Sequence, residues 1–215
     1  MNQSEMIRLT EEFVFELLSD EASGHDWWHI HRVTSLAKTI AEKEGADLFI
    51  CEMAALLHDV ADEKLNSSEE SGISKVRQWL RSLQVDGESS KHIIEIITTM
   101  SFKGGGQPPV KTLEGKVVQD ADRLDAIGAV GIARVFAFSG AKGQLIYDPT
   151  IPVREQLTKE EYRKQKTTAI NHFYEKLLKL KGLMNTSYGK QMAEQRHAFM
   201  EEYLKTFLGE WQGIR

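Results

Sequence analysis

The sequence has only one cysteine, Cys51, among its 215 residues. A single cysteine excludes an intrachain disulfide and any zinc site that requires several thiolates. Because Cys51 lies in an apolar stretch, we expect its side chain to be buried and unreactive.

Long apolar runs are also missing. No stretch of about 18 apolar residues occurs, which argues against a helix that spans a membrane. The segment Met1–Thr10 mixes polar and acidic groups and lacks the apolar core of a signal peptide. We therefore expect a soluble, cytoplasmic protein with no membrane partner.

An excess of positive charge is absent as well. The chain has 27 Lys and Arg residues against 32 Asp and Glu residues, a formal net charge of −5. It therefore offers no general positive field for a nucleic-acid backbone, and we expect no nucleic-acid polymer as a partner. The hydrophobic share of 41% is ordinary for a globular protein, and the length predicts a single domain over residues 1–215.

Proline is scarce, and its positions are informative. All four prolines fall between segments whose apolar residues recur with helical spacing. No segment has a convincing strand pattern, so the predicted fold class is all-α. The predicted helices cover residues 5–19, 26–44, 47–60, 71–84, 89–101, 112–138, 158–181 and 187–208. The longest predicted irregular stretches are 102–110 and 139–157.

His29 is the first residue along the chain whose position suggests a functional role. It precedes Val33 by four residues, on the apolar stripe of the helix predicted for 26–44, so we expect it to face the interior. His31 shares a polar face with Thr34 and is expected at the surface. His25 lies one turn before His29, and a site role for it stays open, although the HExxH pattern of metalloproteases is absent.

A second group of polar residues ends a solidly apolar helical run over residues 53–57. His58 and Asp59 follow directly, and a carboxylate buried there without a partner would cost several kcal/mol. A divalent cation would satisfy both side chains. Neighbouring residues on an ideal helix point about 100° apart, so one ion can contact both only where the helix ends or distorts. The predicted helix end at Val60 fits this requirement.

Three carboxylates cluster within residues 120–125, between apolar flanks. Asp122 and Asp125 share a face with apolar residues, whereas Asp120 lies next to basic residues such as Arg123. This spacing favours Asp122 as an inward-facing group. The alternative is that the whole triplet lies on a solvated helix face.

Together these residues resemble the HD-domain phosphohydrolase superfamily, whose pattern is a histidine, then a His-Asp doublet, then a distant aspartate. His29, the doublet His58-Asp59, and Asp122 occur in that order. The resemblance implies that these four side chains hold one divalent metal ion. It extends through the flanking residues to a small bacterial subgroup of standalone HD enzymes.

The resemblance also implies an architecture and a cofactor. It implies a compact helical HD domain, with a metal-binding core at about residues 20–140 and additional C-terminal helices at about 155–210. Two imidazoles and two carboxylates suit Mn²⁺, the favoured ion, and also Co²⁺, Ni²⁺, Fe²⁺ or Mg²⁺. Such an ion can activate water and stabilise charge on phosphoryl oxygens.

Two residues are candidates for moving protons. The resemblance implies that Asp62 orients the attacking water or accepts its proton, and the alternative is a surface residue of a loop. His92 begins a run rich in isoleucine. It is a candidate donor to the leaving oxygen, and the alternative is a core histidine with a structural role.

Four basic residues are candidates for binding the phosphates of a ligand: Arg32, Lys64, Lys103 and Arg123. Lys103 is attractive because the glycines at 104–106 leave main-chain N–H groups open to a phosphate. The glycine run lacks the ending of a Walker motif, however, so a mobile loop is an equal interpretation.

The predicted function is metal-dependent hydrolysis of nucleotides, and the subgroup resemblance points to (deoxy)nucleoside triphosphate pyrophosphohydrolysis. A 5′-nucleotidase is the nearest alternative. A non-catalytic metal- or nucleotide-sensing domain is another, although the full ligand set argues against it. A two-metal HD-GYP phosphodiesterase is disfavoured because the Gly-Tyr-Pro signature is missing. The sequence leaves the oligomeric state open, with a homodimer among the options.

Overall fold

The computed structural model describes residues 1–19, 26–62, 65–100, 110–154 and 167–214. Within these ranges every regular element is a helix, which confirms the all-α prediction. The chain divides into two compact units, residues 1–121 and 122–215. The single domain expected from the chain length stays a prediction, since compact units of this size can belong to one domain.

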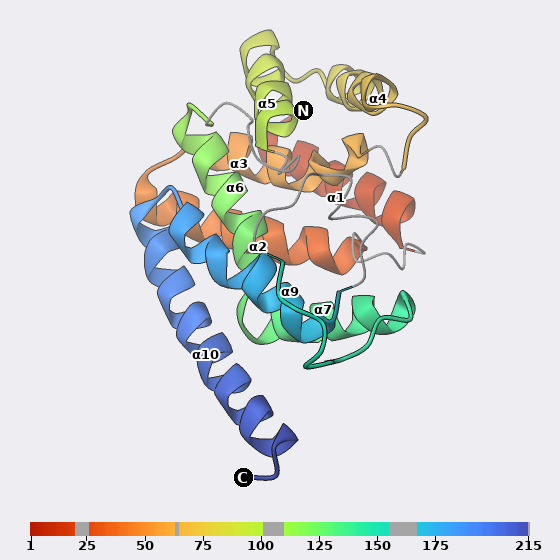
Figure 1. Ribbon diagram of the computed structural model, residues 1–215. Helices are drawn as coiled ribbons and strands as arrows, with labels where there is room; N and C mark the ends of the chain where they lie inside the picture. Colours follow the sequence, from red (N-terminus) through yellow and green to blue (C-terminus); the bar gives the residue numbers. More distant parts are fainter. Residues whose placement is uncertain (20–25, 63–64, 101–109, 155–166, 215) are drawn as a thin grey trace. The chain divides into compact units, whose positions relative to one another are not determined.

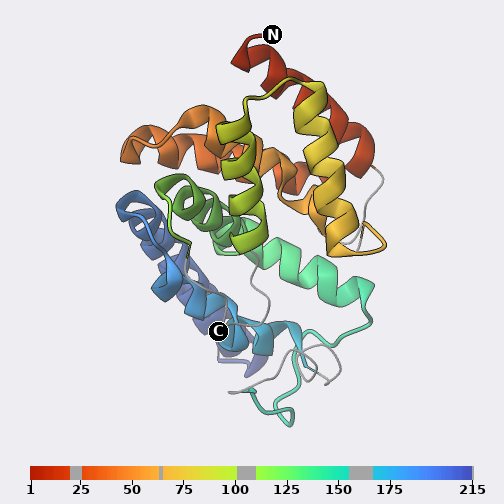
Figure 2. The ribbon, with the colours of Figure 1, turned by 90° about the horizontal axis from the view of Figure 1, so that it is seen from above.

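The first unit contains the N-terminal helices. They are α1 (Gln3–Leu18), α2 (Trp27–Glu44), α3 (Leu48–Leu57), the short 3₁₀ helix η1 (Asp59–Ala61), α4 (Glu69–Ser82), α5 (Gly87–Met100) and most of α6 (Leu113–Asp125) (Figure 1). The helices α1, α2 and α5 pack against α3, and α4 packs against both η1 and α5. Figure 2 shows α4 and α5 side by side.

The central helix α3 is apolar on almost every side. All of its residues except Leu48 and Glu52 are buried, as expected for a helix that other helices surround. Cys51 is fully buried, which confirms the expectation from the sequence. Burial and the nearby charge of Glu114 raise the pKa of the Cys51 thiol, so this thiol stays protonated and unreactive.

The second unit contains the C-terminal helices. They are the last turn of α6, then α7 (Gly128–Ala141), α9 (Ala169–Glu175), the 3₁₀ helix η2 (Leu177–Leu183) and α10 (Ser187–Trp211). The fully buried ring of Phe173 in α9 packs against Phe136 of α7 and stacks on Tyr203 of α10. This aromatic contact joins the three helices.

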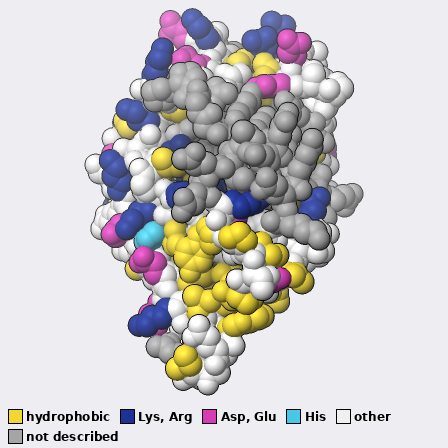
Figure 3. Space-filling view, in the orientation of Figure 1, with side chains coloured by type: hydrophobic (Ala, Val, Ile, Leu, Met, Phe, Trp, Pro, Cys, Tyr) yellow, Lys and Arg dark blue, Asp and Glu magenta, His cyan; other side chains and the backbone are white. Residues whose placement is uncertain are grey.

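Apolar side chains also gather on the outside of the second unit (Figure 3). Leu145 and Ile146 are more than half exposed. Their main-chain carbonyls accept hydrogen bonds from the N–H groups of Ala169 and Ile170 in the first turn of α9. The backbone of this non-helical segment is therefore anchored although its side chains are not buried.

The single helix predicted over 112–138 is wrong, because the chain turns between α6 and α7. Gly128 has φ of 76°, in the left-handed region that favours glycine. A Cβ at Gly131 would lie 2.3 Å from the carbonyl oxygen of Ala126, so this corner also needs a glycine there. Arg196 of α10 donates a hydrogen bond to the carbonyl of Leu124. The corner thus depends on close backbone approach, which the apolar periodicity does not reveal.

The helix predicted over 158–181 is also wrong in its described part. Thr168 is the N-cap of α9, and its hydroxyl accepts a hydrogen bond from the N–H of Asn171. At Lys176 the backbone leaves the helical region, and η2 follows as a separate 3₁₀ helix. A side-chain cap and a 3₁₀ segment therefore divide a region whose leucines suggested one continuous helix.

Among the described residues, no single helix is both long enough and apolar enough to cross a membrane. The bent pair α6 and α7 meets that test of length and composition when its two helices are taken together.

Candidate metal centre

Three side chains of the first unit converge at the C-terminal end of α3. One comes from α2, and the other two come from the residues that directly follow α3. Each of His29, His58 and Asp59 offers one ligand atom, and these atoms all lie within 4.8 Å of one another. The side chains are 2%, 6% and 9% exposed, respectively. The sequence-based prediction that these three residues come together therefore agrees with the structure.

The first turn of α2 positions His29. Asp26 is the N-cap of this helix, and its carboxylate accepts a hydrogen bond from the main-chain N–H of His29 at 2.8 Å. His29 shares its buried face with Val33 and Ala37, as the spacing predicted. His31 is exposed, also as predicted, but Thr34 is buried, so the polar face of α2 is narrower than the sequence suggested.

The end of α3 positions His58 and selects its tautomer. The Nδ1 atom of His58 lies 2.7 Å from the carbonyl oxygen of Ala55. A carbonyl can only accept a hydrogen bond, so Nδ1 carries the proton and, in the neutral ring, Nε2 carries the lone pair. This is the tautomer that binds a metal through Nε2, with the other nitrogen held by a main-chain carbonyl.

Asp59 connects the two histidines. Its carboxylate oxygens lie 3.5 Å from Nε2 of His29 and 3.4 Å from Nε2 of His58. The helix α3 ends at Leu57, and Asp59 begins the 3₁₀ helix η1. Such a change is needed because adjacent residues of an ideal helix cannot both face one ion. The observed break in helix type provides it.

A divalent ion fits this set of donor atoms. Ligand atoms about 2.1 Å from a metal lie about 3.0–3.4 Å apart along the edges of an octahedron or a tetrahedron. The two contacts of Asp59 with the histidines are close to that spacing. A cation would also compensate the charge of a carboxylate that is almost fully removed from water. Imidazole and carboxylate donors suit Mn²⁺ and its first-row neighbours.

The segment after Asp59 is fixed by its own hydrogen bonds. Asp62 follows η1 in an extended conformation, and its N–H donates to the carbonyl of Asp59 at 3.0 Å. The side-chain amide of Asn66 donates to the carbonyls of Val60 and Asp62. Gly72 of α4 closes the packing, since a Cβ there would lie 2.6 Å from the carbonyl oxygen of Ala61.

Sequence reasoning missed Asn66 and Gly72 as parts of this arrangement. Asn66 carries a weak signal, because an asparagine just after a helix often binds main-chain groups. Gly72 carries no signal of its own within the helical pattern of α4. Its role depends on how closely α4 approaches η1, which is a tertiary contact.

Asp122, the fourth ligand that the resemblance implies, lies in α6 and is half-buried. Asp120 and Asp125 are the fully buried carboxylates of this helix. The alternative that the whole triplet lies on a solvated helix face is therefore wrong, because α6 buries a wider face than its apolar residues define. Asp125 is paired with Arg134 at 2.6 Å. The ligand role of Asp122 stays a prediction.

His92 lies at a different place from the three converging residues. Its Nε2 atom is 3.7 Å from one carboxylate oxygen of Glu114, and the other oxygen of that carboxylate accepts a hydrogen bond from the N–H of Asp47, the N-cap of α3. His58, the C-cap of this helix, follows Asp47 by eleven residues, so the two lie about 16 Å apart along the helix axis. The structure therefore does not bring His92 together with His58.

The predicted phosphate-binding residues are only partly described. Arg32 is half-buried in α2, three residues after His29 and thus on a neighbouring position of the same helix surface. Arg123, in the last turn of α6, donates a hydrogen bond to the carbonyl of Leu183. Lys64 and Lys103, like His25, lie outside the described residues.

Comparison with known proteins agrees with this geometry. The model of the HD domain family matches residues 27–127, a range that includes His29, His58, Asp59 and Asp122. The whole chain aligns with the protein YpgQ of Bacillus subtilis at 44% identity over 216 residues, covering 96% of that protein. This chain belongs to the HD superfamily.

Several solved structures resemble this chain over its whole length. An HD-superfamily hydrolase from Bacillus thuringiensis has a TM-score of 0.80 at 53% identity, covering 98% of this chain and 99% of that one. A Lactobacillus plantarum protein has a TM-score of 0.83 at 43% identity, with 97% and 98% covered. YpgQ in complex with ADP has a TM-score of 0.78 at 42% identity, with 97% and 100% covered. At the level of the superfamily, the HD domain described here is that of a metal-dependent phosphohydrolase.

Proposed function

We propose that this chain hydrolyses (deoxy)nucleoside triphosphates to the monophosphate and pyrophosphate, with one divalent ion, Mn²⁺ favoured, held by His29, His58, Asp59 and Asp122. The observation that carries this proposal is the convergence of His29, His58 and Asp59 at the buried end of α3. Asp122 is included in the proposed ligand set because of its place in the HD pattern.

The nucleotide part of the proposal is supported by a relative. The Bacillus subtilis protein YpgQ, 42% identical to this chain in the structural comparison, has been crystallised in complex with ADP. A relative that matches this chain along its whole length and binds an adenine nucleotide makes a nucleotide the first substrate class to test.

We assign a separate role to each residue of the proposed site. A divalent ion held there would supply Lewis-acid chemistry, lowering the pKa of water and neutralising charge on phosphoryl oxygens. His58 would bind it through Nε2, because the contact of Nδ1 with Ala55 fixes the required tautomer. Asp62 would orient the attacking water and accept its proton. Arg32, one turn beyond His29 in α2, would contact a phosphate of the substrate.

The proposed reaction is a direct displacement by water. The water oxygen forms a bond to the α-phosphorus while the bond from that phosphorus to the bridging oxygen breaks. Pyrophosphate leaves with the bridging oxygen, and the proton of the water passes to Asp62. No protein nucleophile is needed, which is consistent with the protonated thiol of Cys51, the only cysteine of the chain.

The test is a panel of nucleoside mono-, di- and triphosphates, assayed with Mn²⁺, Co²⁺ and Mg²⁺ while phosphate and pyrophosphate are measured separately. We expect triphosphates to give pyrophosphate and monophosphate in equal amounts, and chelation to stop the reaction. His58→Ala and Asp122→Ala should lose the metal and more than about 100-fold of the activity, since even outer partners of metal ligands contribute 10–100-fold.

The other outcomes identify the alternatives. Release of phosphate from monophosphates alone would make the protein a 5′-nucleotidase. Binding of metal and nucleotide without turnover would make it a sensing domain. Full metal content and full activity in both His58→Ala and Asp122→Ala would refute the metal centre itself. His31→Gln is the matched histidine control, because His31 is exposed on the same helix as His29.

A further inference from the structure

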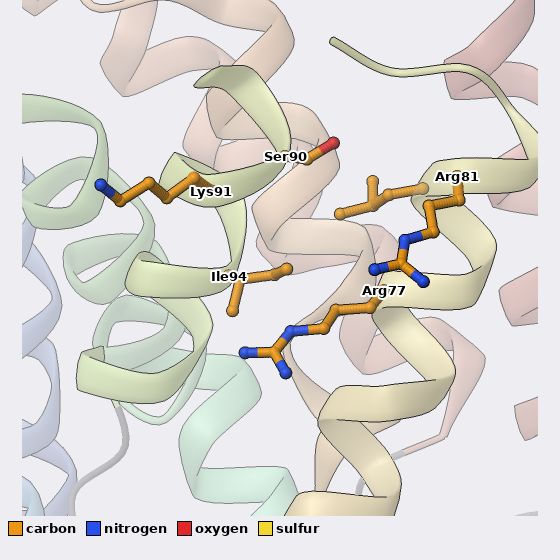
Figure 4. Close-up of a pocket in the computed structure, with 6 residues that line it drawn as sticks. Arg77, Arg81, Ser90, Lys91 and Ile94 are labelled. Atoms are coloured by element: carbon orange, nitrogen blue, oxygen red, sulfur yellow. The ribbon is translucent and has the colours of Figure 1, made fainter. Parts of the chain in front are cut away.

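A groove with basic side chains lies between α4 and α5 in the first unit. Its volume is about 250 Å³, and it is lined by Arg77, Leu80 and Arg81 of α4 and by Ser90, Lys91 and Ile94 of α5 (Figure 4). Leu80 is buried and Ile94 is half-buried, so the groove has apolar as well as basic walls.

The two arginines present their charge to this groove. Arg77 and Arg81 are four residues apart and therefore share one face of α4. Figure 4 shows both guanidinium groups directed into the space between the helices, while the ammonium group of Lys91 points away from it. Two guanidinium groups thus face the groove, and Lys91 contributes its aliphatic stem and adds positive charge at the border.

No ion pair among the described residues neutralises the two arginines of the groove, Arg77 and Arg81, and both side chains are exposed. The nearest carboxylate in the α4–α5 connection, that of Asp86, accepts hydrogen bonds from the N–H groups of Glu88 and Ser89 at the start of α5. The bonds from Ser89 and Glu88 lower the pKa of Asp86 and engage its carboxylate at the start of α5.

The groove is separate from the metal centre. The N-terminal half of α4 contacts the metal-centre segment, where Gly72 packs against Ala61 of η1. Arg77 and Arg81 lie five and nine residues farther along the helix, about 7.5 Å and 13.5 Å from Gly72 along its axis. A ligand in the groove would therefore contact α4 and α5, and α4 would connect it to the segment that carries Asp59 and Asp62.

We propose that this groove is a second binding site, for a small molecule that carries a diphosphate group. Guanidinium groups bind phosphate oxygens in a bidentate manner, and two of them one helical turn apart can engage two linked phosphates. A volume of about 250 Å³ is at the lower limit for small-ligand pockets, which suits a diphosphate with little else attached. This site is independent of the proposed hydrolysis.

The test is calorimetric titration of the metal-loaded protein with inorganic pyrophosphate. The parent should bind pyrophosphate in the groove whether or not the metal centre also binds it. Arg77→Gln/Arg81→Gln should lose at least tenfold of the affinity for this groove-bound pyrophosphate, and its metal-dependent nucleotide hydrolysis should be unchanged. Arg77→Lys/Arg81→Lys should bind with intermediate affinity, because lysine cannot engage phosphate in a bidentate manner.

The matched control removes two positive charges elsewhere in the first unit. Lys43 and Lys111 are exposed and do not line the groove, so Lys43→Gln/Lys111→Gln should bind pyrophosphate as the parent does. The groove site is overturned if Arg77→Gln/Arg81→Gln binds pyrophosphate with the stoichiometry and affinity of the parent. It is equally overturned if the control variant loses as much binding, because the effect would then reflect net charge. A circular dichroism melt confirms that each variant is folded.

Discussion

The side-chain nitrogen of Asn66 lies 2.9 Å from the main-chain carbonyl oxygen of Asp62, to which it donates a hydrogen bond. The same amide group donates to the carbonyl of Val60 at 2.8 Å. Asn66 therefore holds both sides of the turn that leads from the His-Asp doublet to Asp62. We infer that Asn66 is a positioning residue for the carboxylate of Asp62.

Replacing Asn66 should separate this role from a general effect on folding. Asn66→Ala leaves two carbonyls without their donor, so we expect the free energy of unfolding to fall by about 1–3 kcal/mol. At a temperature where the variant is fully folded, kcat should still drop while KM and metal content stay near those of the parent. Ser67→Ala, at the exposed neighbouring position, is the control. Full kcat in folded Asn66→Ala would assign Asn66 a purely structural role.

Asp62 should act on the attacking water and not on the metal. Asp62→Asn preserves the shape of the side chain but removes its charge and its ability to accept a proton. We expect kcat to fall by about 10²–10⁴-fold, the usual contribution of general acid–base groups, with nearly unchanged metal content and stability. Steady-state kinetics measure kcat, and elemental analysis measures the metal content. Loss of the metal would make Asp62 a ligand, and a kcat within a few-fold of the parent would make it a passive residue of the loop.

His29 and His31 provide a matched pair on one helix. The side chain of His29 is 2% exposed and lies 3.5 Å from Asp59, whereas His31 is exposed and its ring packs edge-on against Trp28. We expect His29→Gln to lose bound metal and activity and His31→Gln to keep both, as measured by elemental analysis of the purified proteins. Metal loss in a folded His31→Gln variant would contradict the assignment of the two faces.

His172 should make stability depend on pH in the second unit. Burial, and to a smaller extent the charge of Lys176, lower the pKa of His172 from 6.5 to about 4. Above pH 6.5 neither the folded nor the unfolded state is protonated, so His172 contributes no pH dependence there. Between pH 6.5 and 4 the unfolded state binds the proton more tightly. The free energy of unfolding therefore decreases as the pH is lowered from 6.5 to 4, by about 1.4 kcal/mol per pH unit and about 3 kcal/mol in total.

Denaturant titrations at several pH values measure this effect. Between pH 5 and 6.5, where few carboxylates titrate, His172→Gln should have a flatter stability profile than the parent. His31→Gln, which removes an exposed histidine, should keep the slope of the parent. Equal slopes in the parent and in His172→Gln would show that His172 is protonated in the folded protein at the same pH as in the unfolded chain.

The sequence alone determined the local part of this structure. The apolar spacing of α2 placed His29 on the buried face, and the apolar run of α3 placed His58 and Asp59 at the end of a core helix. The order of these residues and Asp122 along the chain was enough to indicate the HD superfamily. Periodicity succeeds here because burial of an apolar helix face is the dominant favourable contribution to folding, and it acts on residues close in sequence.

Only the tertiary structure decided where separate segments meet. The corner at Gly128, the contact of Gly72 with Ala61, and the pairing of His92 with Glu114 all join residues through backbone approach or side-chain contacts that apolar periodicity does not encode. Periodicity specifies which face of a helix is buried, but not which neighbour covers it or how closely that neighbour approaches. The spacing favoured Asp122 over Asp120 as the inward-facing carboxylate, but Asp120 is the more deeply buried of the two, because surrounding helices can bury a polar side chain once its partners are in place.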